Sequence, residues 1–424
     1  MEPSGNPEIR SVTPIVERVG GKAWLYWGVA ALAYLVAVHQ RSSFGVASLD
    51  AAHRYHVGPA LLSLFAVVQI VAYSLAQIPV GVALDHFGPR RMITTGAFVM
   101  GVGQLLLAFT NVYPLALAGR IIVGLGDAMT FISVLRVTTS WFPPSRNAMM
   151  TQIIGLLGWI GQLLSAIPFA YVLRHQSWTF SFSLLTVTSI VVGTFSYLIV
   201  RDRNPELLLN SWPTRKALIN RVKITWAHPA TKIGFWSHWS SPFSANMFSL
   251  IWGVPFLVKA EGFRKSQATT SLTSIVFFGA LAGIALGYLI GHFPKHLDRI
   301  SYSVCTLIAA FWTLVLLWPG QAPYSLLIAL MGIISIGGPA SLTGFAHARK
   351  HIPLENMGTA DGIINAAGFY STLLAMLSVG IVLQIFGNYS LTSFRVAFLT
   401  LYPIWIIGFI KIRKYHNQLE RHTS

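Results

Sequence analysis

Gly81-Val-Ala-Leu-Asp85-His-Phe-Gly88-Pro-Arg90-Arg91 is a short polar stretch between two long apolar runs, which cover about 59–84 and 91–110. Gly88 favours a tight turn, and adjacent arginines are typical of loops on the positively charged side of a membrane. A helix that crosses about 30 Å of hydrocarbon needs roughly 20 residues. The stretch therefore predicts a loop between two transmembrane helices.

The composition of the whole chain supports a membrane protein. Of its 424 residues, 54% are hydrophobic and only 10% are charged, whereas a soluble protein carries about 25% charged residues. The formal net charge is +17, but the Lys and Arg residues lie in short clusters between apolar runs, so we do not expect nucleic acid as a partner. Cys305 is the single cysteine, which excludes an internal disulfide and a cysteine-based metal site.

Apolar runs of spanning length continue along the chain, and we count twelve. Their approximate limits are 24–49, 59–84, 91–110, 114–140, 147–173, 178–200, 231–258, 268–292, 300–318, 323–348, 357–386 and 391–411. They predict an all-α membrane protein with twelve transmembrane helices.

The polar segments divide this chain into domains. We expect a tail at 1–22, a six-helix bundle at 23–200, a basic linker at 201–230, a second six-helix bundle at 231–412 and a tail at 413–424. With both termini in the cytoplasm, 21 of the 30 Lys and Arg residues lie on the cytoplasmic side and 6 on the other, as the positive-inside rule requires. The first 22 residues lack signal-peptide features, which favours the plasma or inner membrane.

A weak internal repeat indicates two related halves. One block recurs 206 residues later and a second recurs 210 residues later, in corresponding spans. The matches are Gly81, His86 and Phe87 with Gly287, His292 and Phe293, and Pro143, Gly158, Leu163 and Leu164 with Pro353, Gly368, Leu373 and Leu374. Such repeats predict two pseudo-symmetric bundles with a binding site between them near the midplane.

The loop at 81–91 resembles the signature G-x-x-x-D-x-x-G-x-R-R of the major facilitator superfamily. This resemblance covers essentially residues 20–412, and it implies an alternating-access transporter. It also implies a conformational latch made by Gly81, Asp85, Gly88, Arg90 and Arg91, to which we add Arg136 as a possible partner of Asp85. In the alternative interpretation, Arg90 and Arg91 only determine topology.

A narrower resemblance concerns the fourth span. Gly124-Leu-Gly126-Asp127-Ala128 and Trp141-Phe142-Pro143-Pro144-Ser145-Arg146 resemble G-x-G-E-G and W-F-P-P-x-E-R of the organic anion:cation symporter branch. Arg41, followed by Gly45-Val46-Ala47, is similar to that branch's D-R-x-x-x-G-x-A. Gln40 stands where that branch usually has Asp, and Asp127 stands where it usually has Glu. The resemblance implies proton-coupled transport of an organic anion.

Three ionisable residues within spans are candidates for function, because charge inside a membrane is costly and usually faces a cavity or a partner. We predict that Arg41 binds the substrate, since its guanidinium suits a carboxylate or phosphate. Asp127 and Arg120 share a helix face and are predicted to couple transport to protons. The alternatives are a static pair of Asp127 with an arginine, and pairing of Arg41 with Asp50.

Uncharged polar side chains in other spans complete the predicted substrate site. Each is also consistent with a hydrogen bond that joins two helices. These residues are Tyr34, Gln69, Tyr73, Gln152, Trp159, Asn246 and Asn365.

Catalytic, nucleotide-binding and metal-binding patterns are absent from the sequence. We therefore expect no enzyme, no cofactor and no metal, but a monomer in the lipid bilayer that moves a small solute. The leading interpretation is proton-coupled transport of an organic anion. The alternative is an efflux antiporter for hydrophobic or cationic compounds, which would favour an acidic cavity.

Overall fold

The fold is known from a computed structural model, which describes residues 19–57, 59–203 and 214–423. Most of the expected amino-terminal tail, residues 1–18, lies outside the described residues. The first half comprises α1 (Gly21–Val46), α2 (Ser48–Tyr55), α3 (Pro59–Phe109), α4 (Tyr113–Ala128), α5 (Phe131–Trp141), α6 (Pro144–Leu164), the π-helix η1 (Ser165–Phe169), α7 (Ala170–His175) and α8 (Trp178–Ile199).

The second half begins after α9 (Arg215–Ala227). Its seventh span is built from α10 (Pro229–Ser240), α11 (Phe243–Met247), η3 (Phe248–Trp252), α12 (Gly253–Pro255) and η4 (Phe256–Ala260). The remaining helices are α13 (Lys265–His292), α14 (Leu297–Leu316), α15 (Tyr324–Ser335), α16 (Gly337–Ala340), α17 (Leu342–His351), the 3₁₀ turn η5 (Leu354–Asn356), α18 (Met357–Phe386), α19 (Leu391–Phe398) and α20 (Leu401–Thr423).

The long helix α3 contains two spans. Gly88 interrupts it with φ 75° and ψ 164°, a conformation that side-chain-bearing residues rarely adopt. A Cβ at Gly88 would also lie 2.8 Å from an Asp202 carboxylate oxygen. The predicted loop is therefore a sharp kink within continuous helix.

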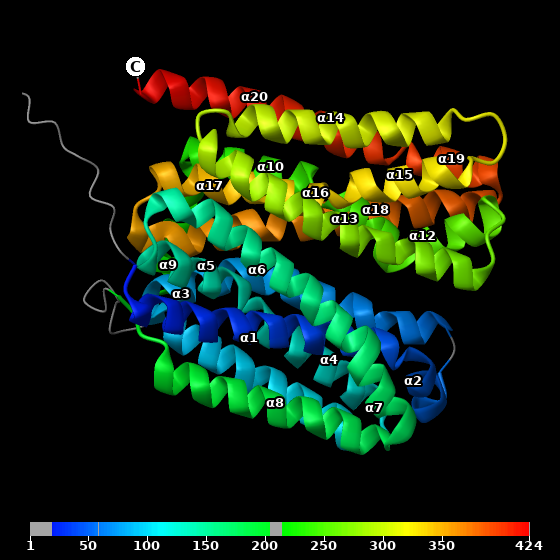
Figure 1. The fold of residues 1–424 in the computed structure, drawn as a ribbon, viewed down its shortest axis with the longest axis horizontal. Coiled ribbons are helices and arrows are strands. Elements are labelled where there is room, and N and C mark those ends of the chain that lie inside the picture. Colours follow the sequence, from blue (N-terminus) through cyan, green and yellow to red (C-terminus); the bar gives the residue numbers. More distant parts are fainter. Residues whose placement is uncertain (1–18, 58, 204–213, 424) are drawn as a thin grey trace, which may run out of the picture.

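The described residues contain 11 helical segments long and apolar enough to cross a membrane, and one of these, Leu64–Phe109, has 46 residues. Because Gly88 divides that segment, the spans number twelve, as predicted. They form two bundles, one drawn below the other in Figure 1. The predicted all-α fold of two six-helix bundles is confirmed.

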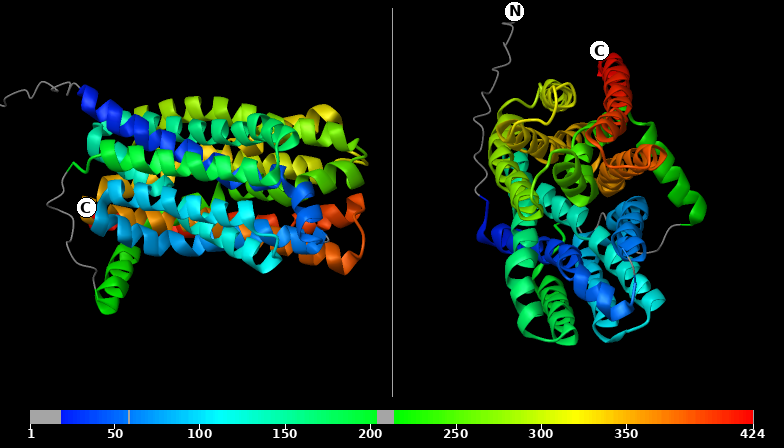
Figure 2. Two further views of the ribbon diagram at one scale, coloured as in Figure 1. Left: turned by 90° about the horizontal axis from the view of Figure 1, so that it is seen from below. Right: turned by 90° about the vertical axis from the view of Figure 1, so that its right-hand side faces the viewer.

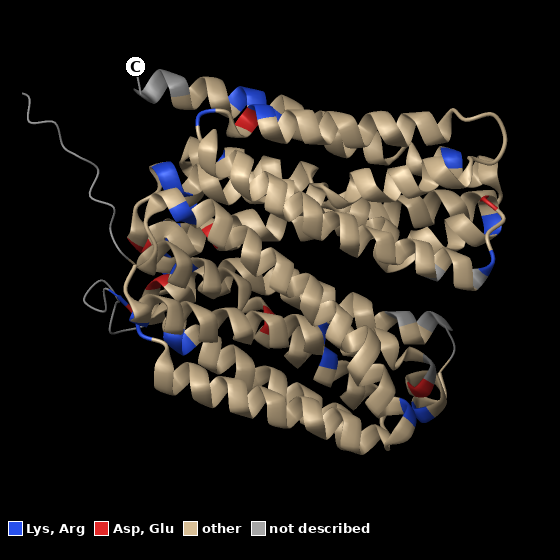
Figure 3. Ribbon diagram, viewed as in Figure 1, with Lys and Arg blue, Asp and Glu red and all other residues tan. Residues whose placement is uncertain are grey.

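Charged residues are concentrated at the ends of the bundles, which leaves the middle of the helices mostly apolar (Figure 3). We call the end at which α8 ends and α10 begins the linker end. The ribbons of the two bundles lie close together there and diverge toward the opposite end (Figure 1). A buried hydrophobic core crosses between the bundles at the linker end, where Leu135 belongs to the same cluster as Phe345 and Ala360.

Two helices extend into segments that the sequence predicted to be a linker and a tail. The expected linker contains the helix α9, whose first turn is capped by the Thr214 hydroxyl accepting the Ala217 N–H. The last helix, α20, continues to Thr423, whereas the apolar run ends near residue 411. Helix formation continues because the residues beyond 411 include neither Gly nor Pro.

Candidate functional site

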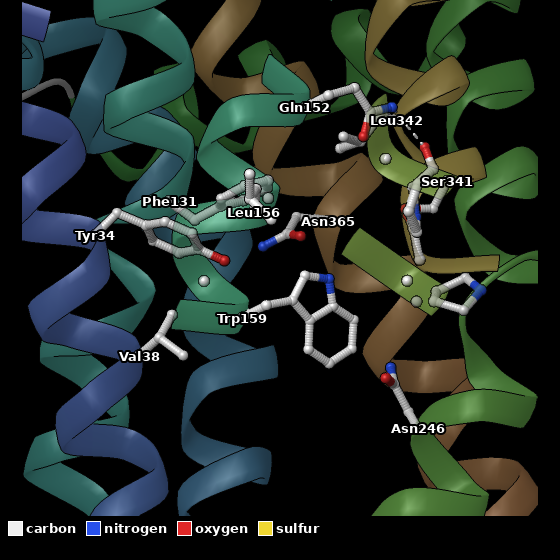
Figure 4. Close-up of a pocket in the computed structure, with 18 of the residues that line it drawn as sticks. Tyr34, Val38, Phe131, Gln152, Leu156, Trp159, Asn246, Ser341, Leu342 and Asn365 are labelled. Atoms are coloured by element: carbon white, nitrogen blue, oxygen red, sulfur yellow. Dashed lines mark hydrogen bonds between the residues drawn. The ribbon is translucent and has the colours of Figure 1, made fainter. Parts of the chain in front are cut away.

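A cavity of about 200 Å³ lies between the two bundles. Figure 4 shows side chains from both halves around it, with Tyr34 and Trp159 on one side and Asn246 on the other. Helices α1, α3, α5 and α6 form one wall, and α10, α11, α13, α16, α17 and α18 contribute to the other. The site therefore lies at the interface that the internal repeat predicted.

Seven of the eight residues predicted for the substrate site line this cavity. The first-half wall carries Tyr34, Arg41, Tyr73, Gln152 and Trp159, and the second-half wall carries Asn246 and Asn365. Figure 4 shows the Trp159 ring extending into the space between the bundles. The eighth residue, Gln69, is not among the lining residues.

Several of these polar side chains also join the two bundles. The Asn365 amide donates hydrogen bonds to the Tyr73 hydroxyl at 3.1 Å and to the side-chain amide oxygen of Gln77 at 2.8 Å. The Gln152 amide donates to the Pro339 carbonyl oxygen at 3.0 Å. Cavity lining and interhelical bonding, which the sequence left as alternatives, occur together here.

Arg41 and Asp127 form an ion pair at the cavity wall. The Arg41 Nη1 atom lies 3.1 Å from an Asp127 carboxylate oxygen. The Arg41 side chain is 28% exposed, whereas that of Asp127 is 1% exposed. Arg41 thus faces the cavity, and Asp127 lies behind it. The ion-pair partner of Arg41 is Asp127 and not Asp50, which was the alternative.

Arg120 makes its hydrogen bonds with groups other than Asp127. It is buried and lies over the Phe44 ring, and it donates one hydrogen bond to the side-chain amide oxygen of Gln69 and a second to the backbone carbonyl oxygen of Arg41. The hydrogen-bonded ion pair of Asp127 is made with Arg41 rather than with Arg120. Arg120 remains within electrostatic range of Asp127.

The sequence did not identify every polar residue of the cavity. His238 and Ser341 line its second-half wall, and the His238 Nδ1 atom lies 3.3 Å from the Ser341 carbonyl oxygen. A lone histidine in an apolar run carries no spacing signal, so the tertiary fold was needed to find His238.

Asp85 connects the two bundles at the linker end. Its carboxylate accepts the Gly358 N–H at 2.7 Å and the Thr359 N–H and hydroxyl at 2.8 Å and 2.6 Å. These donors lie in the first turn of α18, where unpaired N–H groups and the helix dipole favour a negative charge. Arg136 lies 3.8 Å from Asp85 and donates to the Leu354 carbonyl oxygen, so the expected proximity of these two residues is present.

Glycines allow α3 and α18 to approach closely beside Asp85. A Cβ at Gly81 would lie 2.4 Å from the Gly358 carbonyl oxygen, and one at Gly362 would lie 2.3 Å from the Gln77 carbonyl oxygen. Arg349 of α17 also donates to the Thr151 hydroxyl of α6 at 2.9 Å. The linker end is therefore closed in this conformation.

The two arginines of the loop lie on the first-half side of this closed end. The Arg90 backbone N–H donates to Asp202 at 3.1 Å, and its side chain donates to the Tyr197 carbonyl oxygen at 2.9 Å. Arg91 is exposed. Burial raises the pKa of the Asp202 carboxyl, and the Arg90 N–H acts in the opposite direction. Arg90 thus holds the end of α8 against the kink of α3.

Among the residues that the structure describes, no group of three or more His, Cys, Asp or Glu side chains is arranged to hold a metal ion. The polar groups of the cavity are instead hydrogen-bond donors and acceptors around one cation. This arrangement suits reversible binding of a small polar solute.

Comparison with known proteins gives relatives of matching length. The chain is 18% identical to an uncharacterized transporter of Bacillus subtilis (strain 168), with 93% of this chain and 96% of that protein covered. It is 20% identical to a probable galactarate/D-glucarate transporter of Escherichia coli (strain K12), over 86% and 88% of the two chains.

The fold is also found in solved structures. The proton:xylose symporter XylE superimposes with a TM-score of 0.69 at 13% identity, over 94% of this chain and 96% of that one. A sequence profile of the Major Facilitator Superfamily matches residues 30–320. The chain is therefore a multi-pass membrane protein that belongs to the Major Facilitator Superfamily, a family of transporters and not of enzymes.

Proposed function

We propose that this transporter is a secondary active symporter that moves a small organic anion with protons. The observation that carries the proposal is the Arg41–Asp127 pair, in which the cation faces the cavity and the acid is buried behind it. A guanidinium in a partly dry cavity binds a carboxylate strongly and with defined geometry. Arg41 is the proposed anion-binding residue.

Coupling follows from competition for Arg41. While Asp127 is ionised, it neutralises Arg41 and reduces the attraction of the cavity for an anion. A proton on Asp127 removes that competing charge, and an anion on Arg41 weakens the hold of Arg41 on Asp127. Each ligand therefore strengthens binding of the other, which is the thermodynamic requirement for symport. We assign Arg120 a supporting electrostatic role beside Asp127.

The lining favours a hydroxylated substrate with one carboxylate. Among the described residues that line the cavity, Arg41 is the single Lys or Arg. Amide and hydroxyl groups of Asn246, Asn365, Tyr34 and Tyr73 surround it and suit sugar-like hydroxyl groups. The galactarate/D-glucarate relative supports a sugar acid. Galactarate and D-glucarate each carry two carboxylates, so the proposal of a single carboxylate rests on the cavity lining alone.

Alternating access requires that the closed linker end opens. We propose that Gly81, Asp85, Gly88, Arg90, Arg91 and Arg136 act as the latch of this end. We place the protein in the plasma or inner membrane, with the linker and both termini in the cytoplasm. In this orientation, the conformation described here is closed to the cytoplasm. Release of Asp85 from α18 would then accompany opening to that side.

The test is uptake of organic acids into liposomes that contain the purified protein, driven by an imposed proton gradient. We expect wild type to accumulate a sugar acid and Arg41→Ala to lose at least roughly thirtyfold in affinity, because removing one partner of such a contact costs about 2 kcal/mol or more. The matched control is Arg54→Ala, since Arg54 lies in α2 and bonds the Thr110 and Ala108 carbonyl oxygens outside the cavity.

Two results would overturn the proposal. If no acid accumulates and hydrophobic cations are moved against the proton gradient, the protein is an efflux antiporter. If an acid accumulates equally in wild type and in Arg41→Ala, the anion binds elsewhere.

A further inference from the structure

The helix α9 (Arg215–Ala227) has features that transport through the central cavity does not use. It contains Lys216, Arg221 and Lys223 and no acidic residue, together with exposed Ile219 and Ile224. Figure 2 shows α9 at the linker end, lying across the direction of the long helices and standing out from their outer surface. A helix in this position that carries basic side chains together with exposed isoleucines can contact both the lipid headgroups and the acyl chains beneath them.

An apolar groove separates α9 from the outer face of α3. It has a volume of about 300 Å³ and is lined on the α3 side by Ile78, Pro79 and Val82. The α9 side contributes Leu218, Ile219, Val222 and Lys223, and Lys223 is the one charged residue among the described residues that line the groove. The α3 wall belongs to the spanning segment Leu64–Phe109, so the groove opens where acyl chains surround the protein.

A second, polar hollow adjoins the groove along α9. It has a volume of about 790 Å³ and is lined by Thr214, Lys216, Ala217, Ile219, Asn220 and Lys223. Ile219 and Lys223 line both spaces, so the apolar and polar parts meet at these two residues. The exposed ammonium groups of Lys216 and Lys223 therefore lie beside the groove rather than on the opposite face of α9.

We propose that this composite surface binds one anionic phospholipid. One acyl chain occupies the groove between α3 and α9, and the phosphate lies near Lys216 and Lys223, with the Asn220 amide available to the rest of the headgroup. The occupant is anionic because the described residues that line the polar part offer two ammonium groups and no carboxylate. It is a lipid rather than a soluble phosphate because the adjoining part is wholly apolar except for Lys223.

Binding at this surface would act on the closed end of the transporter. The helix α9 packs against both α3 and α18, which are the helices joined by Asp85. Arg221 also lies 3.2 Å from the Nδ1 atom of His86, the neighbour of Asp85. A lipid that holds α9 in place therefore stabilises the closed linker end.

The test is native mass spectrometry of the full-length protein released from phosphatidylcholine nanodiscs that contain increasing fractions of phosphatidylglycerol. We expect one phosphatidylglycerol to remain bound most tightly to wild type. Lys216→Gln with Lys223→Gln should weaken this binding roughly tenfold or more, because each ammonium group contributes to attraction of an anionic lipid. Ile219→Trp should weaken it similarly by filling the groove without changing the charge.

The matched control is Lys411→Gln with Lys414→Gln, which removes the same charge from α20, where these side chains lie near the Trp236 and Tyr415 rings. Equal loss in this control would show a general charge effect and overturn the proposal. Retention of the lipid by either α9 variant would also overturn it, and so would equally tight retention of phosphatidylcholine. Each result is independent of which solute the protein transports.

Discussion

Arg41 and Asp127 experience different surroundings although they touch. Asp127 is almost fully buried and has Arg41 as its ion-pair partner, whereas more than a quarter of the Arg41 side chain is exposed to the cavity. Breaking such a pair from the buried side leaves an uncompensated charge, which is costly in a dry environment. A proton on Asp127 or an anion on Arg41 removes part of that cost, so the pair is a suitable point for coupling.

Replacement of Asp127 by Asn should separate binding from coupling. The amide cannot titrate, so the variant should still exchange internal for external anion but should lose accumulation driven by a proton gradient. Counterflow and gradient-driven uptake, measured in the same liposomes, report the two activities separately. A variant that accumulates anion as wild type does would exclude Asp127 as the coupling residue.

The charge of the cavity predicts selectivity between acids. With Arg41 as the single lining Lys or Arg among the described residues, a second carboxylate would have no cation and would be desolvated at a cost. We expect a sugar monocarboxylate to bind at least roughly tenfold more tightly than the matching dicarboxylate. Competition binding at one pH with both acids fully ionised measures this ratio, and preference for the dicarboxylate would contradict it.

At the residue scale, the sequence identified the charged residues of the site better than it identified the residues with which they interact. The cost of ionisable groups in a membrane indicated Arg41 and Asp127. Helix spacing placed Arg120 on the same face as Asp127, whereas the ion-pair partner in the fold is Arg41, from another helix. Gln69 shares a helical face with Tyr73 and yet bonds Arg120. These differences depend on the rotation of packed helices, which a single sequence does not encode locally.

At the element scale, the contact between α3 and α18 depends on backbone proximity. Gly81, Gly358 and Gly362 bring the two helices so close that a Cβ at any of them would overlap the opposite backbone or the Asp85 side chain. Small residues at such crossings allow close packing of membrane helices. The two helices therefore pack closely in this conformation, and the addition of a single methyl group at one of these glycines would disturb the contact.

Gly81→Ala should open the linker end. The added Cβ would meet the Gly358 carbonyl oxygen at 2.4 Å, and overpacking of this kind costs about 1–3 kcal/mol. We expect a roughly tenfold shift or more toward the conformation open at the linker end. Labelling of cysteines introduced in the closed interface reports the shift.

Gly28→Ala is the matched control for this change, because a Cβ at Gly28 in α1 would have nothing within 4 Å. The introduced cysteines should be labelled in this variant at the same rate as in the parent protein. Unchanged labelling of Gly81→Ala would show that the contact between α3 and α18 does not control access.

The elements that the sequence predicted well are those with long apolar runs. All twelve spans were recognisable because their lengths match the bilayer. The helix α9 was not predicted, since its apolar residues are interspersed with basic ones over only 13 residues. Its position against α3 became visible only in the folded chain.

At the scale of the whole molecule, we propose that solute binding and the control of access occur at different places in the interface between the two bundles. The cavity occupies the middle of the contact between the bundles, and Asp85 with its glycine neighbours closes the linker end. The internal repeat and the loop at 81–91 predicted this division. The sequence could not predict which end is closed, because that choice is an energetic balance between two packings of the same helices.

Proton uptake on anion binding tests the central claim most directly. Purified protein in weakly buffered detergent solution is mixed with a sugar acid that is fully ionised at the working pH, and a pH indicator records the change. The reciprocity of linked binding predicts uptake of up to about one proton per anion bound, and none in Asp127→Asn. Anion binding without proton uptake at any pH, or with the same uptake in Asp127→Asn, would contradict coupling through the Arg41–Asp127 pair.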